Sequence, residues 1–348
     1  MPASSHPSPS RSGQVTMAMV ATRAGVSTQT VSNALNTPEL LRPETLERVL
    51  RTIDEMGYRP HRAARSLRTR TSRLIGYGIR SAASGGSSPI LDRFLHALSA
   101  TADEAGYRIL LFASPAGPDS LAVYEELLGE RGVDAFVLSD THRGDRRQRW
   151  LDQRGIPFVA FGRVWSGRET GDWVDVDGAA GTDAAVEHLA ALGHRSIAFL
   201  GWPRGSGAGD DRAQGWLRAM RRHGLPVRGR RAESTDDVPS AAAAAVPLLD
   251  AGATAVVTAS DTLALGCYRA LGERGAAPGR EVSVTGFDDS PAASLVSPGL
   301  TSIGQPLEDV GRECIRLLLG RVEDTGRTPE RVLLAPSLVV RDSTFAPL

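Results

Sequence analysis

The sequence contains no lysine, so all 40 of its basic residues are arginines. Every basic contact to a ligand or nucleic acid must therefore come from Arg, and a phosphate loop that depends on a Walker lysine is excluded. Cysteine is nearly absent as well. Cys267 and Cys314 stand far apart inside apolar helical patterns. This spacing gives neither a metal site nor a disulfide framework, and it favours two buried free thiols.

Long apolar runs are also missing. No run reaches the ~18 residues that a membrane-spanning helix requires. The first residues, MPASSHPSPSRSG, lack the apolar segment of a secretory signal. We expect residues 1–13 to form a disordered Ser/Pro tail and the protein to be cytoplasmic. A chain of 348 residues has room for two or three domains.

The charge is zero in total but unevenly distributed. Residues 1–73 hold eleven Arg and five acidic residues, a net of 11 − 5 = +6. The remainder has 40 − 11 = 29 basic and 40 − 5 = 35 acidic residues, a net of −6. A basic N-terminal part on an acidic body fits a nucleic-acid-binding head, because neutralising phosphates supplies most non-specific affinity.

The stretch Val15–Asn36, VTMAMVATRAGVSTQTVSNALN, has the pattern of two short helices joined by a turn. Thr16 and Ser27 stand where N-cap oxygens are needed, and Gly25 can take the positive φ that ends a helix. The outer face of the second helix carries short polar and amide side chains: Thr28, Gln29, Ser32 and Asn33. A helix-turn-helix places such a face in the DNA major groove, where Gln and Asn can pair with adenine. The alternative is an ordinary helical hairpin with a solvated polar face.

A third helix is predicted over Pro43–Met56, and we expect residues 14–60 to form one small helical head. The segment His61–Arg68, HRAARSLR, favours helix but is too short to be stable alone in water. We interpret residues 61–72 as a hinge that becomes helical on DNA and uses Leu67 as an apolar wedge in the minor groove. The alternative is a charged linker with a chance Leu.

From Arg73 onward, short β-branched runs alternate with amphipathic helices. The predicted strands are 73–79, 108–114, 135–140, 157–162, 173–177, 196–202, 255–260, 283–289 and 300–304, and the helices between them include 91–105, 179–192, 214–223, 241–249 and 262–274. This alternation predicts parallel sheets with right-handed crossovers. About 270 residues are many for one open sheet, so two α/β lobes with a cleft between them are expected.

Ligands of parallel sheets bind at the carboxyl ends of the strands. The residues at those ends are Gly162, Arg163, Asp175, Asp177, Trp202, Ser260, Asp261, Asp288 and Asp289. Trp165, Trp173 and Trp202 lie near strand ends, where each could stack on a sugar ring or simply pack at the edge of a lobe.

Signals for an enzyme are weak. The run Gly205–Gly209 lacks the last glycine of a dinucleotide loop, and no Ser sits in a nucleophile elbow. His188 and His194 are six residues apart, which does not put them on one helical face as metal ligands. The HRGD run at 142–145 is interpreted as a solvated charged loop. We therefore expect no catalytic residue, no metal and no cofactor.

The order of these parts resembles the lactose-repressor (LacI) family of transcriptional regulators from about residue 15 to 345. The resemblance rests on the motifs VATRAGVSTQTVSNALN, GYRPHRAARSLR, VDVDGAAGT, AVEHLAALGHRSIAFLG, DRAQGW, TASDTLALG, SVTGFDD and LTSIGQP. It implies a helix-turn-helix head, a hinge helix and a two-lobed α/β core that resembles periplasmic sugar-binding proteins. In numbers, lobe 1 would hold about residues 73–172 and 306–334, and lobe 2 about 173–305 and 335–348.

The resemblance also implies a function: a regulator, mostly a repressor in this family, that binds palindromic operator DNA as a homodimer. A small molecule in the cleft, foremost a sugar and otherwise a nucleobase or another metabolite, would switch its DNA affinity. The competing interpretation is a sugar-binding protein without a regulatory role, but such a secreted protein would need a signal peptide and no DNA-binding head.

Site residues follow from the motif positions and, for Arg163 and Trp202, from their places at strand ends. The residues expected at DNA are Thr16, Ser27, Thr28, Gln29, Thr30, Ser32, Asn33, Asn36, Tyr58, His61, Arg62 and Leu67, of which Thr28, Gln29 and Asn33 would read bases. The residues expected at the effector are Arg163, Trp202, Arg212, Ser260, Asp261, Asp288 and Gln305.

The sequence departs from the family pattern in several places. Arg42 replaces a common Ser before the third helix, so this N-cap is weak, and Met19 replaces a usual Asp. Ser260 replaces a common Asn and reaches less far. The chain carries no helical extension after SLVVRDST, which favours a dimer over a tetramer.

Overall fold

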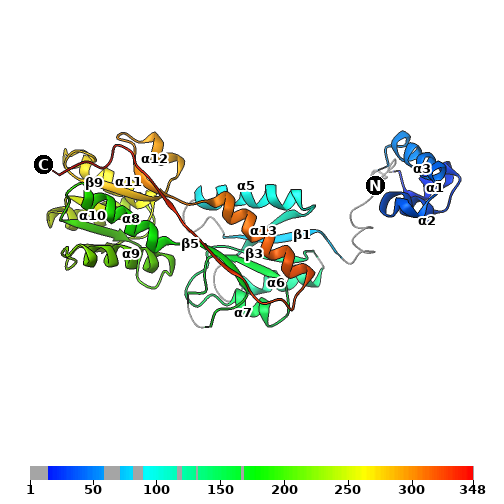
Figure 1. Cartoon of the computed structure of the whole chain (residues 1–348), viewed down its shortest axis with the longest axis horizontal. Helices are drawn as coiled ribbons and strands as arrows, with labels where there is room; N and C mark the ends of the chain where they lie inside the picture. Colours follow the sequence, from blue (N-terminus) through cyan, green and yellow to red (C-terminus); the bar gives the residue numbers. More distant parts are fainter. Residues whose placement is uncertain are drawn as a thin grey trace, which may run out of the picture. The chain divides into compact units, whose positions relative to one another are not determined.

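The computed structural model describes residues 15–58, 71–80, 89–115, 120–130, 132–165 and 168–347. The expected tail and the hinge residues His61, Arg62 and Leu67 lie outside these ranges. The chain divides into two compact units between Ser72 and Arg73, and each is described by itself (Figure 1).

The first unit is a three-helix head whose boundaries are set by local caps. It contains α1 (Met17–Ala24), α2 (Thr28–Asn36), the 3₁₀ turn η1 (Pro38–Leu40) and α3 (Pro43–Glu55). The Thr16 hydroxyl accepts from the Met19 N–H at 3.3 Å, and the Ser27 hydroxyl accepts from the Thr30 N–H at 3.1 Å. Gly25 ends α1 with φ 63°. Arg42 makes no side-chain cap to α3, as its substitution for Ser predicts.

The head buries a small apolar core. Its fully or nearly fully buried members are Val20, Ala21, Ala24, Val31, Ala34, Val49 and Tyr58, with Leu35, Leu46 and Ile53 partly buried against them. These apolar positions recur every three or four residues, so each helix presents one stripe to the other two.

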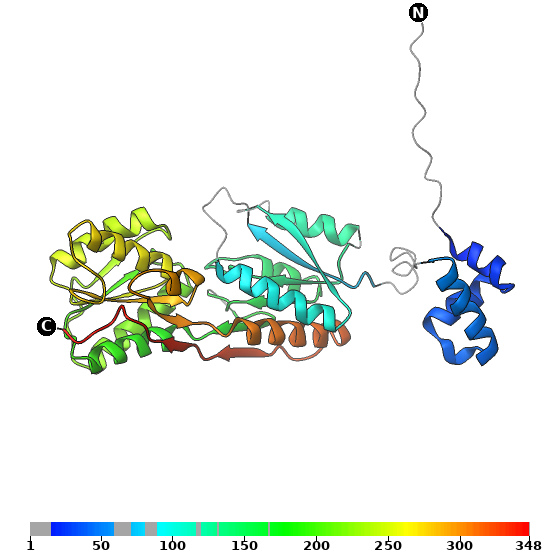
Figure 2. The ribbon, with the colours of Figure 1, turned by 90° about the horizontal axis from the view of Figure 1, so that it is seen from above.

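The second unit holds two lobes, each built on its own sheet. Lobe 1 contains β1 (Leu74–Arg80), α5 (Pro89–Glu104), β2 (Arg108–Ser114), α6 (Ser120–Gly129), β3 (Ala135–Leu138), α7 (Arg147–Asp152), β4 (Phe158–Phe161), β5 (Asp172–Val176), α13 (Leu307–Glu323) and β11 (Arg331–Leu334). Its strands pair in parallel in the order β11-β5-β4-β3-β1-β2. Helices α5 and α13 lie side by side on one face of this sheet (Figure 2).

Lobe 2 repeats this plan. It contains α8 (Gly178–Ala191), β6 (Ile197–Gly201), α9 (Ala208–Arg222), β7 (Arg231–Glu233), α10 (Val238–Asp250), β8 (Ala255–Thr258), α11 (Asp261–Gly272), β9 (Ser283–Asp288), α12 (Pro291–Leu295), β10 (Thr301–Gly304) and β12 (Ser337–Val339). The strand order is β12-β10-β9-β8-β6-β7, and only β12 runs antiparallel to its neighbour among the pairs described.

The strand pairing places the first crossing from lobe 1 to lobe 2 later in the chain than expected. Strand β5 pairs with β4 and β11 in the sheet of lobe 1, so the chain passes into lobe 2 after Val176 and not at residue 173. The sequence pattern missed β7, β11 and β12, which are edge strands of three or four residues. It also places the start of α9 too late along the chain, because the glycines before Asp210 favour a loop.

Close packing of α8 against α9 depends on Gly215. A Cβ at this position would collide with the Ala179 carbonyl oxygen and the Thr182 hydroxyl. We therefore expect Gly215→Ala to lower the free energy of unfolding by about 1–3 kcal/mol through overpacking. Urea unfolding measures this change. Gly272→Ala is the matched control, because a Cβ at that helix end in the same lobe meets no atom within 4 Å; equal effects of the two substitutions would contradict the packing argument.

Both thiols, Cys267 and Cys314, are buried and free, as predicted. Within the described ranges, no helix has the length and apolarity needed to span a membrane.

Candidate functional site

The exposed face of α2 carries polar side chains and no charge. Ser27, Thr28 and Gln29 are exposed at its N-terminal turn, and Asn36 is exposed at its end. The Gln29 side-chain amide donates to the Asn33 side-chain carbonyl at 2.9 Å. This bond leaves the Gln29 oxygen and the Asn33 amide hydrogens as an acceptor and a donor at neighbouring points, the combination that the adenine edge requires in the major groove.

Two of the residues expected at DNA are held inside the head. Tyr58 is only 7% exposed and packs in the helical core. Ser32 is on the buried face of α2, and its carbonyl accepts from the Asn36 side chain at 2.6 Å. Thr30 is half-buried, and its hydroxyl hydrogen-bonds the Ser27 hydroxyl at 2.9 Å. Thr16 is exposed and engaged as the cap of α1.

In lobe 2, Arg212 and Asp288 meet at the carboxyl ends of the strands. Arg212, in the second turn of α9, is 7% exposed and points its Nη1 at the Asp288 Oδ1 from 3.7 Å. The same nitrogen donates to the Ala259 carbonyl. The guanidinium lies over two rings, 3.6 Å from the centroid of Phe287 and 5.0 Å from that of Trp202. Aromatic faces attract a cation in this way, so the group is held on several sides.

Asp288 ends β9 with a φ of 116°, an unusual backbone for a residue with a side chain. Its side chain is 17% exposed and accepts from the Gln305 amide at 2.8 Å. Burial raises the pKa of this carboxyl to about 7, with Asp261 and Asp236 adding to the rise and Arg212 opposing it. Strained backbone and a strongly shifted carboxyl together are typical of a ligand site.

The neighbouring Ser260 and Asp261 have different roles. The Ser260 hydroxyl donates to Asp236 at 2.5 Å and caps α11 by accepting from the Leu263 N–H at 3.2 Å. Asp261 is 3% exposed, and its oxygens accept from the Ser302 hydroxyl at 2.6 Å and the Ser290 N–H at 2.7 Å. Its two oxygens therefore hold the segment after β9 and strand β10.

Lobe 1 contributes Arg163, which follows β4. Its Nε donates to Asp175 at 2.7 Å and its Nη2 to Asp211 of lobe 2 at 2.8 Å. The guanidinium stacks 4.6 Å from the centroid of the Trp165 ring, and the Trp165 indole donates to the Thr141 hydroxyl at 3.2 Å. Arg163 thus directs its fork at two carboxylates of the protein.

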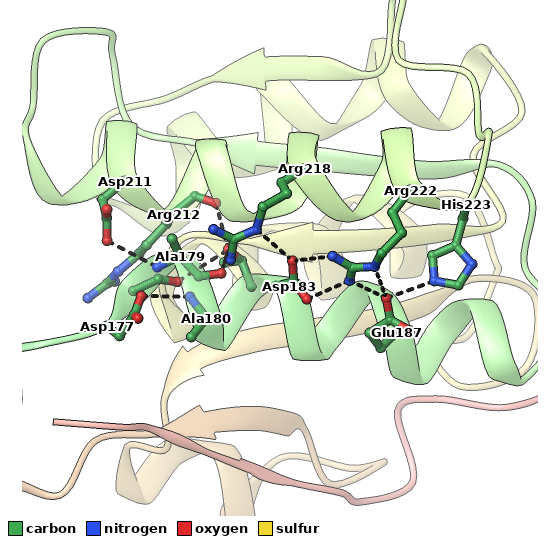
Figure 3. A network of polar contacts seen from close by, with 12 residues as sticks. Asp177, Ala179, Ala180, Asp183, Glu187, Asp211, Arg212, Arg218, Arg222 and His223 are labelled. Atoms are coloured by element: carbon green, nitrogen blue, oxygen red, sulfur yellow. Dashed lines mark hydrogen bonds and ion pairs between the residues drawn. The ribbon is translucent and has the colours of Figure 1, made fainter.

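The acidic residues around the first turns of α9 face different arginines. Arg212 faces Asp288, whereas Asp211 pairs with Arg163 and Asp210 lies 3.8 Å from Arg143. Figure 3 shows Asp211 reaching the Ala179 amide at the start of α8, and Arg218 and Arg222 reaching acids farther along α8. Asp288 and Asp289 point to different partners, since Asp289 pairs with Arg341 at 2.7 Å.

Trp202 and Trp173 have different surroundings. Trp202 follows β6 beside Arg212, and its indole N–H is buried with no hydrogen-bond partner in the described structure. Trp173 lies at the amino end of β5 and packs in the core of lobe 1, so stacking on a cleft ligand is excluded for it.

Several polar residues near the strand ends carried no usable sequence signal. Asp236 follows β7, a strand that the sequence pattern missed, and accepts from the Ser260 hydroxyl. Arg147, the first residue of α7, is 8% exposed and donates to Asp145 at 2.7 Å and to the carbonyl of Ser139, which follows β3, at 2.9 Å. Asp145 belongs to the HRGD run, so that run is not merely a solvated loop.

No group of His, Cys, Asp or Glu side chains suited to a metal ion occurs in the described ranges. His194 is buried and bonded to Thr254, Ser283 and the Phe345 carbonyl, while His188 bonds Thr344. Both histidines therefore hold the C-terminal segment in place.

Comparison with known proteins decides the family. Residues 16–61 match the model of the bacterial regulatory proteins of the lacI family, and residues 186–344 match a periplasmic binding protein-like domain. The HTH-type transcriptional regulator CelR of Thermobifida fusca is 33% identical over 333 residues, covering 94% of this chain and 98% of CelR. The chain belongs to the LacI family of bacterial regulatory proteins.

Other LacI-family members agree along nearly the full length. The regulator MalR of Streptomyces coelicolor is 31% identical over 94% of this chain and 96% of MalR. The solved CelR–cellobiose complex superposes with a TM-score of 0.72 at 30% identity over 95% of this chain and 100% of CelR. The lac repressor dimer bound to operator and the anti-inducer ONPF gives 0.81 at 28% identity, over 96% of this chain and 100% of the repressor. These relatives are transcriptional regulators, and the chain has their helix-turn-helix head and two-lobed core.

Proposed function

We propose that this LacI-family regulator is a repressor that binds a pseudo-palindromic operator as a homodimer and responds to a sugar in the cleft of its core. The observation that carries the proposal is one chain holding both an uncharged amide face on a capped α2 and the buried Arg212–Asp288 pair between aromatic rings. Its place of action would be the cytoplasm, where a bacterial operator lies.

The DNA side of the proposal rests on α2. Thr28, Gln29 and Asn33 would read base edges, with Ser27, Thr30, Asn36 and Thr16 at or near phosphates. Ser32 and Tyr58 would act indirectly, by holding α2 and the end of α3. Because α2 has no Arg, it cannot make the commonest contact to guanine, and the Gln29–Asn33 pair favours adenine. His61, Arg62 and Leu67, outside the described residues, are proposed as the hinge contacts.

The effector side rests on chemistry that suits vicinal hydroxyls. Arg212 offers a rigid fork of donors, Asp288 offers acceptors, and Gln305 and Ser260 add neutral polar groups. Trp202 beside Arg212 can cover the apolar face of a sugar ring. The solved CelR complex holds cellobiose, and a relative of this similarity makes a neutral oligosaccharide the first candidate to screen.

We expect Gln29→Ala to weaken binding to the specific operator by about 1–3 kcal/mol and to relax the preference at one position of each half-site. Fluorescence anisotropy at ~150 mM salt against duplexes from the promoter of its own gene and against random duplexes measures both quantities. The control is Arg51→Ala on α3, whose exposed charge already pairs with Glu47 at 2.8 Å. A wild-type protein without preference between promoter and random DNA would refute the operator proposal.

A further inference from the structure

Two loops of lobe 1 meet the first turn of α9 in lobe 2. The Arg163 Nη2 donates to Asp211 at 2.8 Å, and Arg143 lies 3.8 Å from Asp210. The Trp165 ring packs so closely on Gly207 that a Cβ there would overlap it. One helical turn therefore receives all three of these contacts from the opposite lobe.

The central contact is well shielded from water. The side chains of Arg163, Asp175 and Asp211 are 22%, 12% and 17% exposed. Charges in such a setting interact more strongly than a surface pair, and their loss is felt more. The two bonds use different nitrogens of one planar group, a geometry that the single ammonium of a lysine does not reproduce.

Asp211 passes this contact on to the proposed effector site. The oxygen that accepts from Arg163 also accepts from the Ala179 N–H at 3.0 Å, at the start of α8. The next residue of α9 is Arg212, which points into lobe 2 at Asp288. Any movement of lobe 1 that pulls on Asp211 acts on the backbone that carries Arg212.

We propose that Arg163 is a positioning residue and not an effector contact: through Asp211 it fixes the first turn of α9, and so links the closure of the lobes to the setting of Arg212. The proposal rests on the regulatory function above. It assigns to Arg163 the task of keeping one lobe arrangement populated before any ligand arrives.

The test compares Arg163→Ala, Asp211→Ala and their double variant with the wild-type full chain. Asp211→Ala removes the link between the lobes while leaving Arg163 with Asp175, so it remains informative if Arg163→Ala folds poorly. The matched control is Arg218→Ala, which breaks an ion pair between α9 and α8 inside lobe 2, at 3.0 Å from Asp183. Hydrogen exchange of the ligand-free protein and affinity for the promoter duplex are measured for each.

We expect faster exchange in peptides covering 178–182 and 207–213, and a change in operator affinity of about 5- to 150-fold, the usual range of coupling between sites. The double variant should show less than the sum of the two single effects, because both single variants already lose the same bond between the lobes. The proposal would be overturned if Arg163→Ala and Asp211→Ala exchanged faster but bound operator with the affinity of Arg218→Ala. It would also be overturned if the effects of the two substitutions added up in the double variant. If the wild-type protein shows no operator preference, the regulatory function fails, and exchange alone still decides whether Arg163 fixes α9 through Asp211.

Discussion

Asp288→Asn is expected to raise the free energy of unfolding at pH 8 and to reduce the dependence of this free energy on pH between about pH 4 and pH 7. The wild-type carboxyl has a pKa of about 7 in the folded protein and 3.8 as its reference value. Between these values the folded state holds a proton that the unfolded state has lost. The free energy of unfolding is therefore highest below about pH 4 and falls as the pH rises. It reaches its lower level above about pH 7, where Asp288 is ionised in the folded state as well. At 1.36 kcal/mol per pKa unit, the cost at pH 8 is at most roughly 4 kcal/mol.

Asparagine removes this cost because it carries no charge and its carbonyl can still accept from Gln305. Urea unfolding at pH 4.5, 6 and 8 gives the difference between wild type and variant. Asp183→Asn is a control of opposite sign: burial, which raises the pKa of Asp183, is outweighed by Arg222 and Arg218, which lower it, so its contribution is present at neutral pH and lost as the pH falls. Parallel pH curves for wild type and Asp288→Asn would show that Asp288 is ionised at little cost. A carboxylate that destabilises its own fold is best explained by a ligand that uses it.

Arg212→Ala is expected to abolish the response to effector while operator binding persists at 25 °C. The substitution removes the donor fork and leaves Asp288 and the Ala259 carbonyl without their cation. Breaking a buried pair typically costs about 3–5 kcal/mol, and protonation of Asp288 should hold the loss to the lower end. Thermal unfolding and operator anisotropy, with and without a sugar that raises the melting temperature of the wild type, measure both effects.

General destabilisation must be separated from loss of the ligand grip. Gly266→Ala serves this purpose, because a Cβ there would overlap Ala241 where α11 packs on α10, so the substitution destabilises lobe 2 without touching α9. It should keep the effector response, whereas Arg212→Lys should lose most of it, since an ammonium lacks the planar fork. Should Gly266→Ala and Arg212→Ala lose the response equally, Arg212 would have only a structural role.

Local signals in the sequence were sufficient for the head. Thr16, Gly25 and Ser27 act on neighbours three or four residues away, so their capping roles can be read directly from the chain. Tyr58 shows the limit of this reading. Its motif position implied a DNA contact, but the packing of three helices buries its side chain.

The core shows the same division. Strands with β-branched runs were predicted, while β7, β11 and β12 are defined by their partners and not by their own pattern. Arg212 and Asp288 were found through motifs at strand and helix ends. Two of the contacts that the sequence did not predict join distant residues: Ser260 bonds Asp236, 24 residues away, and Arg163 bonds Asp211, 48 residues away. The bond of Arg147 to Asp145 closes a local loop. The periodicity of a sequence does not encode such pairings.

The way the chain passes between the lobes bears on how the protein is made. The segment after β10 returns to lobe 1 as α13, whose Val310, Ile315 and Leu318 pack with Phe94 and Leu98 of α5. Strands β11 and β12 then complete one sheet each. During synthesis, the apolar face of lobe 1 therefore stays exposed until α13, which follows all the helices of lobe 2, has emerged. A ribosome that stalls before β11 would release a chain in which both sheets lack a strand, so neither lobe would be complete.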